Sequence, residues 1–232
     1  MRILMAFSHQ NGSRGVSRNW RLSRAMAVWG LLLLAQWATP CLADTNVNDM
    51  YWSDQFPTNF NGAVSDMARD SAGNLYVGGN FTTAGGIPAN YVAKWDGNSW
   101  SALGTGVNNW VYELALDSSG NLYVAGDFTT AGGVTANYIA KWDGTAWSAL
   151  GTGLNGGVRA LEVDTSGKVY AGGFFEIAGG VSASHIGKWN GSTWSALGLG
   201  TSGEIHALAM DDSGNVYAGG TFGEAGGVPA EN

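Results

Sequence analysis

The sequence predicts an all-β fold assembled from repeated four-stranded antiparallel units. Three observations lead to this prediction: one segment recurs at a constant spacing, apolar and polar side chains alternate within it, and turn-forming residues separate the alternating stretches. The copies start at positions 64, 111, 158 and 205, so each start lies 47 residues after the previous one. A constant period of this size is typical of arrays in which each unit buries its apolar face against its neighbours.

The second copy, residues 111–157, shows how each unit is expected to fold. Apolar side chains at every second position predict strands, and Gly, Asn, Asp and Ser predict the turns between them. The Asp143-Gly144 pair is a strong hairpin signal before the last strand. The expected strands are 111–116, 122–128, 138–142 and 146–150, with a turn at 117–121 and a longer loop at 129–137.

Four short antiparallel strands in a repeat of this length form the blade of a β-propeller. We therefore expect three full blades, 64–110, 111–157 and 158–204, and a partial fourth, 205–232. The break falls inside the fourth copy, which favours a fragment of a longer protein. The alternatives are a four-bladed ring that lacks a strand, and self-association of chains to complete a ring. In the N-terminal segment 44–63, residues 50–53 resemble a fourth strand that could close the last blade.

Paired tryptophans recur at the same places on the expected third and fourth strands. Large aromatic side chains that keep their place in every unit are explained more simply by packing between blades than by stacking on a ligand. The pairs are Trp95 and Trp100, Trp142 and Trp147, and Trp189 and Trp194.

The segment from Leu75 to Gly104 reads LYVGGNF, then a loop, then YVAKWDGNSWSALG, and it resembles a kelch-type repeat. In such repeats a Gly-Gly pair closes the second strand; the second copy departs from this pattern with Ala125-Gly126. The same phrase is similar to propeller repeats of fungal cortical cell-polarity marker proteins and of exported bacterial proteins. The resemblance covers residues 64–232 and implies the fold, whereas function depends on the sites that a fold carries.

Residues 1–43 have the order of a secretory signal peptide: a basic segment, an apolar run over 25–39 and small residues before an expected cleavage site after Ala43. The apolar run is shorter than the roughly 20 residues of a membrane-spanning helix. An uncleaved anchor is the alternative, and lipid attachment at Cys41 is disfavoured by the preceding Pro40. We expect a secreted or extracytoplasmic product, at the cell surface or in the periplasm, with no stable membrane span after cleavage.

The charge distribution argues against a nucleic-acid partner. All 18 acidic residues and only 6 of the 11 basic residues lie from Asp44 onward, because five arginines lie in the first 24 positions; 6 minus 18 gives a formal charge of −12 there. Such a surface repels phosphate backbones. The single cysteine, Cys41, lies in the expected leader, so the expected mature chain forms no internal disulfide.

Motifs that usually indicate catalysis, cofactors or metals have simpler explanations here. Two Gly-x-Gly-x-x-Gly matches, at 151–156 and 198–203, precede strands instead of the helix that binds a dinucleotide. Each Asp-containing turn (Asp70, Asp117, Asp164 and Asp211) provides too few oxygens for calcium, so these side chains are expected to form turns. We expect no catalytic residue, no metal and no cofactor, although a two-carboxylate glycosidase pair stays open.

The positions that differ between copies indicate where a ligand could bind. The second position of the expected first strand is Ser65, Tyr112, Arg159 or His206, and the connection before that strand also varies. In a propeller these positions lie on the rim of one face, at the central channel. The candidate ligand-binding residues are Trp110, Tyr112, Arg159, Glu204 and His206. Neutral drift between the copies is the alternative explanation.

The leading functional hypothesis is an exported, non-catalytic recognition protein that binds a protein or a glycan. Active sites break repeat symmetry with acids outside the shared pattern, and few such acids occur (Glu113, Glu162, Glu176 and Glu204). The alternatives are a secreted carbohydrate-active enzyme, either a lyase or a hydrolase, and an architectural segment of a larger surface protein.

Overall fold

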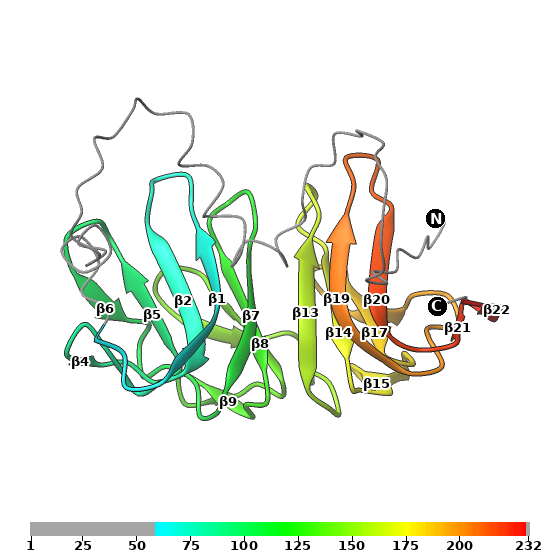
Figure 1. Ribbon diagram of the computed structural model, residues 1–232, viewed down its shortest axis with the longest axis horizontal. Coiled ribbons are helices and arrows are strands. Elements are labelled where there is room, and N and C mark those ends of the chain that lie inside the picture. Colours follow the sequence, from blue (N-terminus) through cyan, green and yellow to red (C-terminus); the bar gives the residue numbers. More distant parts are fainter. Residues whose placement is uncertain (1–58, 231–232) are drawn as a thin grey trace, which may run out of the picture.

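The computed structural model describes residues 59–230, which form strands, turns and loops (Figure 1). The expected leader 1–43, its cleavage site and the expected closing strand at 50–53 lie outside the described residues. No helix occurs between residues 59 and 230, and hence none that could cross a membrane.

Each of the first three copies folds into a four-stranded antiparallel sheet, as the sequence predicts, and the fourth forms a two-stranded sheet. The first sheet contains β1 (Ala63–Arg69), β2 (Leu75–Asn80), β5 (Val92–Trp95) and β6 (Trp100–Ala102). The second contains β7 (Val111–Leu116), β8 (Leu122–Gly126), β11 (Ile139–Trp142) and β12 (Trp147–Ala149). The third contains β13 (Val158–Val163), β14 (Val169–Gly173), β17 (Ile186–Trp189) and β18 (Trp194–Ala196). The last pairs β19 (Glu204–Met210) with β20 (Val216–Thr221).

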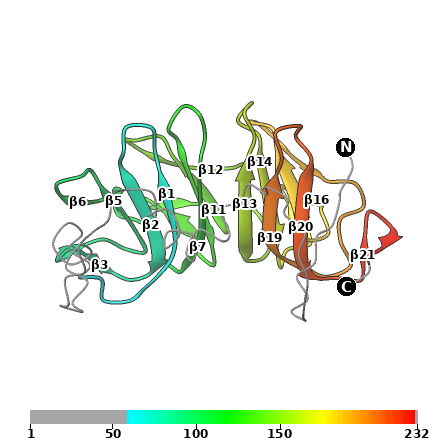
Figure 2. The same cartoon turned by 45° about the horizontal axis from the view of Figure 1, so that its top comes forward.

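The sheets follow one another through the molecule in chain order, and the chain forms a partial β-propeller (Figures 1 and 2). The first strand of each sheet forms one edge, and β1, β7, β13 and β19 lie beside one another in that order. The first strands are therefore the inner strands of the blades.

The loop between the second and third strands contains a short hairpin that the sequence analysis did not predict. Gly132 and Gly133 have φ values of 59° and 84°, and two consecutive residues with positive φ form the type of turn that joins closely paired strands. The hairpins are β3 (Thr83–Ala84) with β4 (Ile87–Pro88), β9 (Thr130–Ala131) with β10 (Val134–Thr135), β15 (Ile177–Ala178) with β16 (Val181–Ser182), and β21 (Glu224–Ala225) with β22 (Val228–Pro229).

The paired tryptophans hold neighbouring blades together, as expected from their recurrence. Trp147 Nε1 in the second blade donates a hydrogen bond of 2.7 Å to the carbonyl oxygen of Leu103, which follows the last strand of the first blade. Trp194 Nε1 donates the equivalent bond, also 2.7 Å, to Leu150. The rings of Trp142 and Trp147 pack with their centroids 5.3 Å apart. The indoles therefore act as inter-blade contacts.

The aspartates of the expected turns accept hydrogen bonds from their own loops, which confirms the turn interpretation. Asp70 accepts bonds from the backbone and side-chain nitrogens of Asn74, at 2.9 and 2.6 Å. Burial opposes ionisation of Asp70, yet the hydrogen bonds from Asn74 hold its pKa below the ordinary value of 3.8. In the hairpin turn before β12, backbone hydrogen bonds from Ala146 and Thr145 and a side-chain bond from Thr145 lower the pKa of Asp143 to about 2.

These turns predict a loss of stability in acid. A carboxyl group whose pKa is lower in the folded than in the unfolded chain stabilises the fold above its unfolded pKa, and this contribution disappears as the pH falls through the folded pKa. The melting temperature is therefore expected to fall between pH 3.8 and about 2, the interval set by Asp143. Thermal melts across this pH range test the prediction. Asp143→Asn should make the melting temperature less dependent on pH. The turn should be retained in this variant, because Asn190 forms the equivalent turn in the third blade. An equally steep dependence in Asp143→Asn would contradict the assignment.

Asn108 connects the segment that precedes β7 to the loop between β8 and β11, on the face of the propeller where the candidate rim residues are expected. Asn108 Oδ1 accepts hydrogen bonds from the backbone nitrogens of Thr129 and Thr130, at 2.8 and 3.0 Å. The connection that enters the first strand is thereby held against the short hairpin of the same blade. In the fourth copy the Ser202 hydroxyl accepts the equivalent bonds.

Asn108→Ala is expected to destabilise the fold by about 1 kcal/mol, because two backbone donors lose their acceptor. Asn108→Ser should cost clearly less, because a serine already performs this role at position 202. Urea unfolding of both variants measures the difference. Equal losses for alanine and serine would show that the hydrogen bonds do not stabilise this loop.

Candidate functional site

The candidate positions on the first strands lie at β-bulges. In each strand the register shifts by one residue, between Val64 and Asp66 in β1 and at the equivalent places in β7, β13 and β19. A bulge adds one residue that has no partner in the ladder and redirects its side chain. The bulged residues are Ser65, Tyr112, Arg159 and His206, the same four that the sequence analysis identified as variable.

Tyr112 links two strands of the second blade and approaches the third. Its hydroxyl donates a hydrogen bond to Oδ2 of Asp127, which lies immediately after β8. Partial burial, together with the hydrogen bond to Asp127 and the charge of that carboxylate, raises the pKa of Tyr112. A Cβ atom on Gly157 would overlap Asp127 Oδ1, so the Asp127 carboxylate lies directly against the start of the third blade. The Trp110 ring meets the Tyr112 ring edge-on at 6.4 Å.

Arg159 lies between two aromatic rings that come from neighbouring blades. Its guanidinium carbon is 3.7 Å from the centroid of Tyr112 and 4.9 Å from that of Phe174, which follows β14. Cation–π contacts of this kind hold a guanidinium in a fixed orientation. Within residues 59–230 no carboxylate forms an ion pair with Arg159. Its charged group is therefore held by contacts with aromatic rings.

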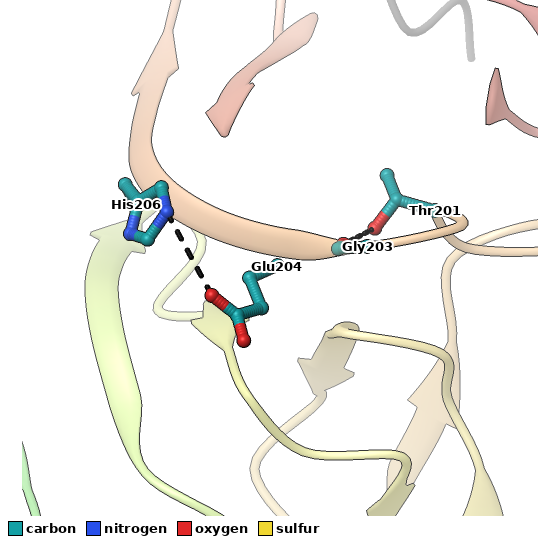
Figure 3. Close-up of polar contacts among 4 residues, drawn as sticks. All are labelled: Thr201, Gly203, Glu204 and His206. Atoms are coloured by element: carbon teal, nitrogen blue, oxygen red, sulfur yellow. Dashed lines mark hydrogen bonds and ion pairs between the residues drawn. The ribbon is translucent and has the colours of Figure 1, made fainter. Parts of the chain in front are cut away.

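The row continues into the fourth blade. The His206 ring meets Phe174 edge-on, with centroids 6.1 Å apart. His206 Nε2 lies 3.9 Å from Glu204 Oε2, and both side chains extend from the start of β19 (Figure 3). The Thr201 hydroxyl donates a 2.8 Å hydrogen bond to the carbonyl oxygen of Gly203, which fixes the turn before Glu204 (Figure 3).

The structure brings all five sequence-predicted candidates into one connected row of side chains. It adds two residues that sequence reasoning missed, Asp127 and Phe174, at the position after the second strand. A signal for them exists, because this position also differs between copies: Asn80, Asp127, Phe174 and Thr221. We call the whole row the rim cluster; its members are Trp110, Tyr112, Asp127, Arg159, Phe174, Glu204 and His206.

The rim cluster places aromatic rings and hydrogen-bond donors and acceptors side by side. Trp110 and Phe174 are 46% and 39% exposed, although large aromatic side chains usually lie inside a protein. Within the described part of the chain, no group of three or more His, Cys, Asp or Glu side chains is arranged to hold a metal ion. The role of the rim cluster in binding stays a prediction.

Comparison with known proteins agrees with the fold. A family model described as a β-propeller domain of unknown function, DUF5122, matches residues 118–141, which lie in the second blade. No curated protein matches the chain.

Three solved structures illustrate what the chain is similar to. The extracellular domain of a B. thetaiotaomicron protein classed as a one-component system matches at 12% identity and a TM-score of 0.48, over 73% of this chain and 22% of that one. A gluconolactonase from Xanthomonas campestris matches at 14% identity and 0.43, over 68% and 54%. PorZ, a surface component of the type-IX secretion system of Porphyromonas gingivalis, matches at 16% identity and 0.40, over 64% and 23%. The chain thus spans about a fifth of the length of the first structure, and repeated four-stranded blades are what its own structure shows.

Proposed function

We propose that the chain is an exported, non-catalytic recognition protein whose propeller presents the rim cluster to a protein or a glycan. The observation that carries this proposal is the convergence of the variable positions. The variable residues at the bulges, Tyr112, Arg159 and His206, and Phe174 at a strand end contact one another across three blades. Neutral drift between the copies, the alternative explanation, does not account for side chains from several blades that contact one another in a continuous row.

The scaffold around the rim cluster supports the same conclusion. The tryptophan pairs, the turn aspartates and the inter-loop hydrogen bonds recur from blade to blade, so the blades provide a constant frame. On this frame the rim positions carry different side chains in each copy. Binding proteins commonly place variable residues on a rigid scaffold in this way.

Export is the second part of the proposal. The basic, apolar and small-residue order of residues 1–43 supports a cleaved leader, and the acidic balance from Asp44 onward suits an extracytoplasmic protein. We also propose that residues 64–232 are kelch-like repeats of the type found in exported bacterial proteins and fungal cortical cell-polarity markers. The Gly-Gly pairs and the recurring WSALG segments support this assignment.

The test compares the wild-type protein with a Tyr112→Ala/Arg159→Ala double variant on glycan and protein arrays. We expect the wild type to bind a ligand that the double variant loses, because the variant removes the centre of the rim cluster. Val134→Ala is the matched control, since Val134 is 42% exposed and outside the rim cluster. Unchanged binding by the double variant would contradict the proposed site. Turnover in a panel of lyase and hydrolase substrates would instead favour the carbohydrate-active enzyme.

A further inference from the structure

We infer that the ligand of the rim cluster is a neutral oligosaccharide, with its sugar rings on Trp110 and Phe174 and its hydroxyl groups on Arg159 and Asp127. This inference rests on the proposed function and specifies the chemical class of the ligand. It follows from three properties of the cluster: its exposed rings, its arrangement of donors and acceptors, and its charge.

The exposed rings provide the apolar part of the site. Trp110 and Phe174 are 46% and 39% exposed and lie at opposite ends of the stack that Tyr112 and Arg159 form. The two rings belong to different blades, so they form two separate aromatic platforms along the rim cluster. A pyranose ring has an apolar face of C–H groups and a polar edge, and an amphipathic surface with aromatic rings and a few fixed polar groups complements it.

The polar groups between the platforms match hydroxyl groups. The rings of Tyr112 and Phe174 lie close to the guanidinium group of Arg159. Arg159 therefore offers a ligand the N–H donors at the edge of this group. Asp127 is an acceptor whose carboxylate has several lone pairs, of which the Tyr112 hydroxyl uses one. A donor and an acceptor held by the same tyrosine suit the vicinal hydroxyl groups of a sugar, because each hydroxyl both donates and accepts.

The charge of the cluster favours a neutral sugar over an acidic one. Arg159 carries one positive charge, whereas Asp127 and Glu204 carry two negative charges, so the cluster has a formal charge of −1 when His206 is neutral. The sequence from Asp44 onward carries a formal charge of −12. A uronate or a sulfated sugar therefore meets a repulsive field that the single arginine does not offset. A neutral sugar gains the same ring and hydroxyl contacts without this repulsion.

The experiment measures binding of the purified protein to neutral gluco-, manno-, xylo- and galacto-oligosaccharides, and to oligogalacturonates and alginate oligosaccharides as acidic counterparts. We expect at least one neutral series to bind more tightly than the acidic ones. Trp110→Ala, Phe174→Ala and Asp127→Ala should each weaken that binding about tenfold, because each removes an aromatic platform or the carboxylate acceptor. Tyr112→Phe should also weaken it, since Asp127 loses the hydroxyl that holds it, and Val134→Ala should leave it unchanged. Thermal melts confirm that each variant is folded.

The outcomes separate this inference from the proposed function. Tighter binding of an acidic oligosaccharide or of a protein, lost in the rim variants, would overturn the neutral-sugar inference and leave the proposed function standing. Neutral-sugar binding that survives all the rim substitutions would contradict both the inference and the proposed site. Absence of binding to every neutral series would also overturn the inference.

Discussion

Trp147→Ala is expected to lower the free energy of unfolding by about 3–5 kcal/mol, the usual cost of removing a buried tryptophan. Trp147 is 8% exposed and packs on Trp142, and its Nε1 donates to the Leu103 carbonyl oxygen of the preceding blade. Alanine removes the packing and leaves that carbonyl group without its donor. For a domain of this size the melting temperature should fall by roughly 10 °C, which calorimetry measures directly.

Two further variants identify the cause of this loss. Trp147→Phe retains most of the ring volume but not the hydrogen bond to Leu103, so its loss should lie between those of the wild type and Trp147→Ala. Trp110→Ala removes the same kind of side chain from an exposed position and should change stability by no more than about 0.5 kcal/mol. A Trp147→Ala variant as stable as Trp110→Ala would show that the indoles do not hold the blades together.

Gly126→Ala should produce the second largest loss, about 3 kcal/mol, because the added methyl group overpacks a site bounded by backbone. A Cβ atom at this position would overlap the carbonyl oxygen of Trp110, on the bulged entry to β7. The equivalent glycines 79, 173 and 220 face the equivalent carbonyl oxygens in their own blades. Urea unfolding measures the effect, and rim ligand binding should weaken as well, because Trp110 belongs to the rim cluster.

The neighbouring position provides the control. Gly78 and Gly172 face side chains of the next blade, Val111 and Ile205, which can adjust to an added methyl group. The second blade already has Ala125 there, fully buried in the core. Gly172→Ala is therefore expected to cost clearly less than Gly126→Ala. A larger loss of stability in Gly172→Ala than in Gly126→Ala would contradict this explanation. The close carbonyl oxygen that recurs in each blade would then not be the reason for glycine at the end of the second strand.

The sequence predicted most of the scaffold because its signals are local and repeated. Alternating side chains located the strands of the second blade, and the recurrence of Trp142 and Trp147 indicated their role between blades. The short hairpin β9–β10 was missed because each of its strands has only two residues, too few for a period to show. The Gly132-Gly133 pair is the signal for this hairpin, but a glycine pair is equally compatible with an irregular loop.

The rim cluster could be predicted only in part, because contacts between blades depend on three-dimensional geometry. Comparison of the copies identified Tyr112 and Arg159, but alternation gave no sign that both lie at bulges. Asp127 and Phe174 lie at the end of a predicted strand, where a polar and an aromatic residue look unrelated. Phe174 contacts Arg159 within the third blade, and only the packing of the fourth blade against the third brings His206 to Phe174.

The most direct test of this account is a double-mutant cycle between Tyr112 and Arg159, read out as affinity for the rim ligand. The two residues come from neighbouring blades and contact each other at 3.7 Å. If they form one site, Tyr112→Ala and Arg159→Ala should each weaken binding, and the double variant should be little weaker than either single variant, with a coupling of about 1 kcal/mol. Strictly additive effects, or single variants that bind as the wild type does, would contradict the claim that variable positions of separate blades form one recognition site.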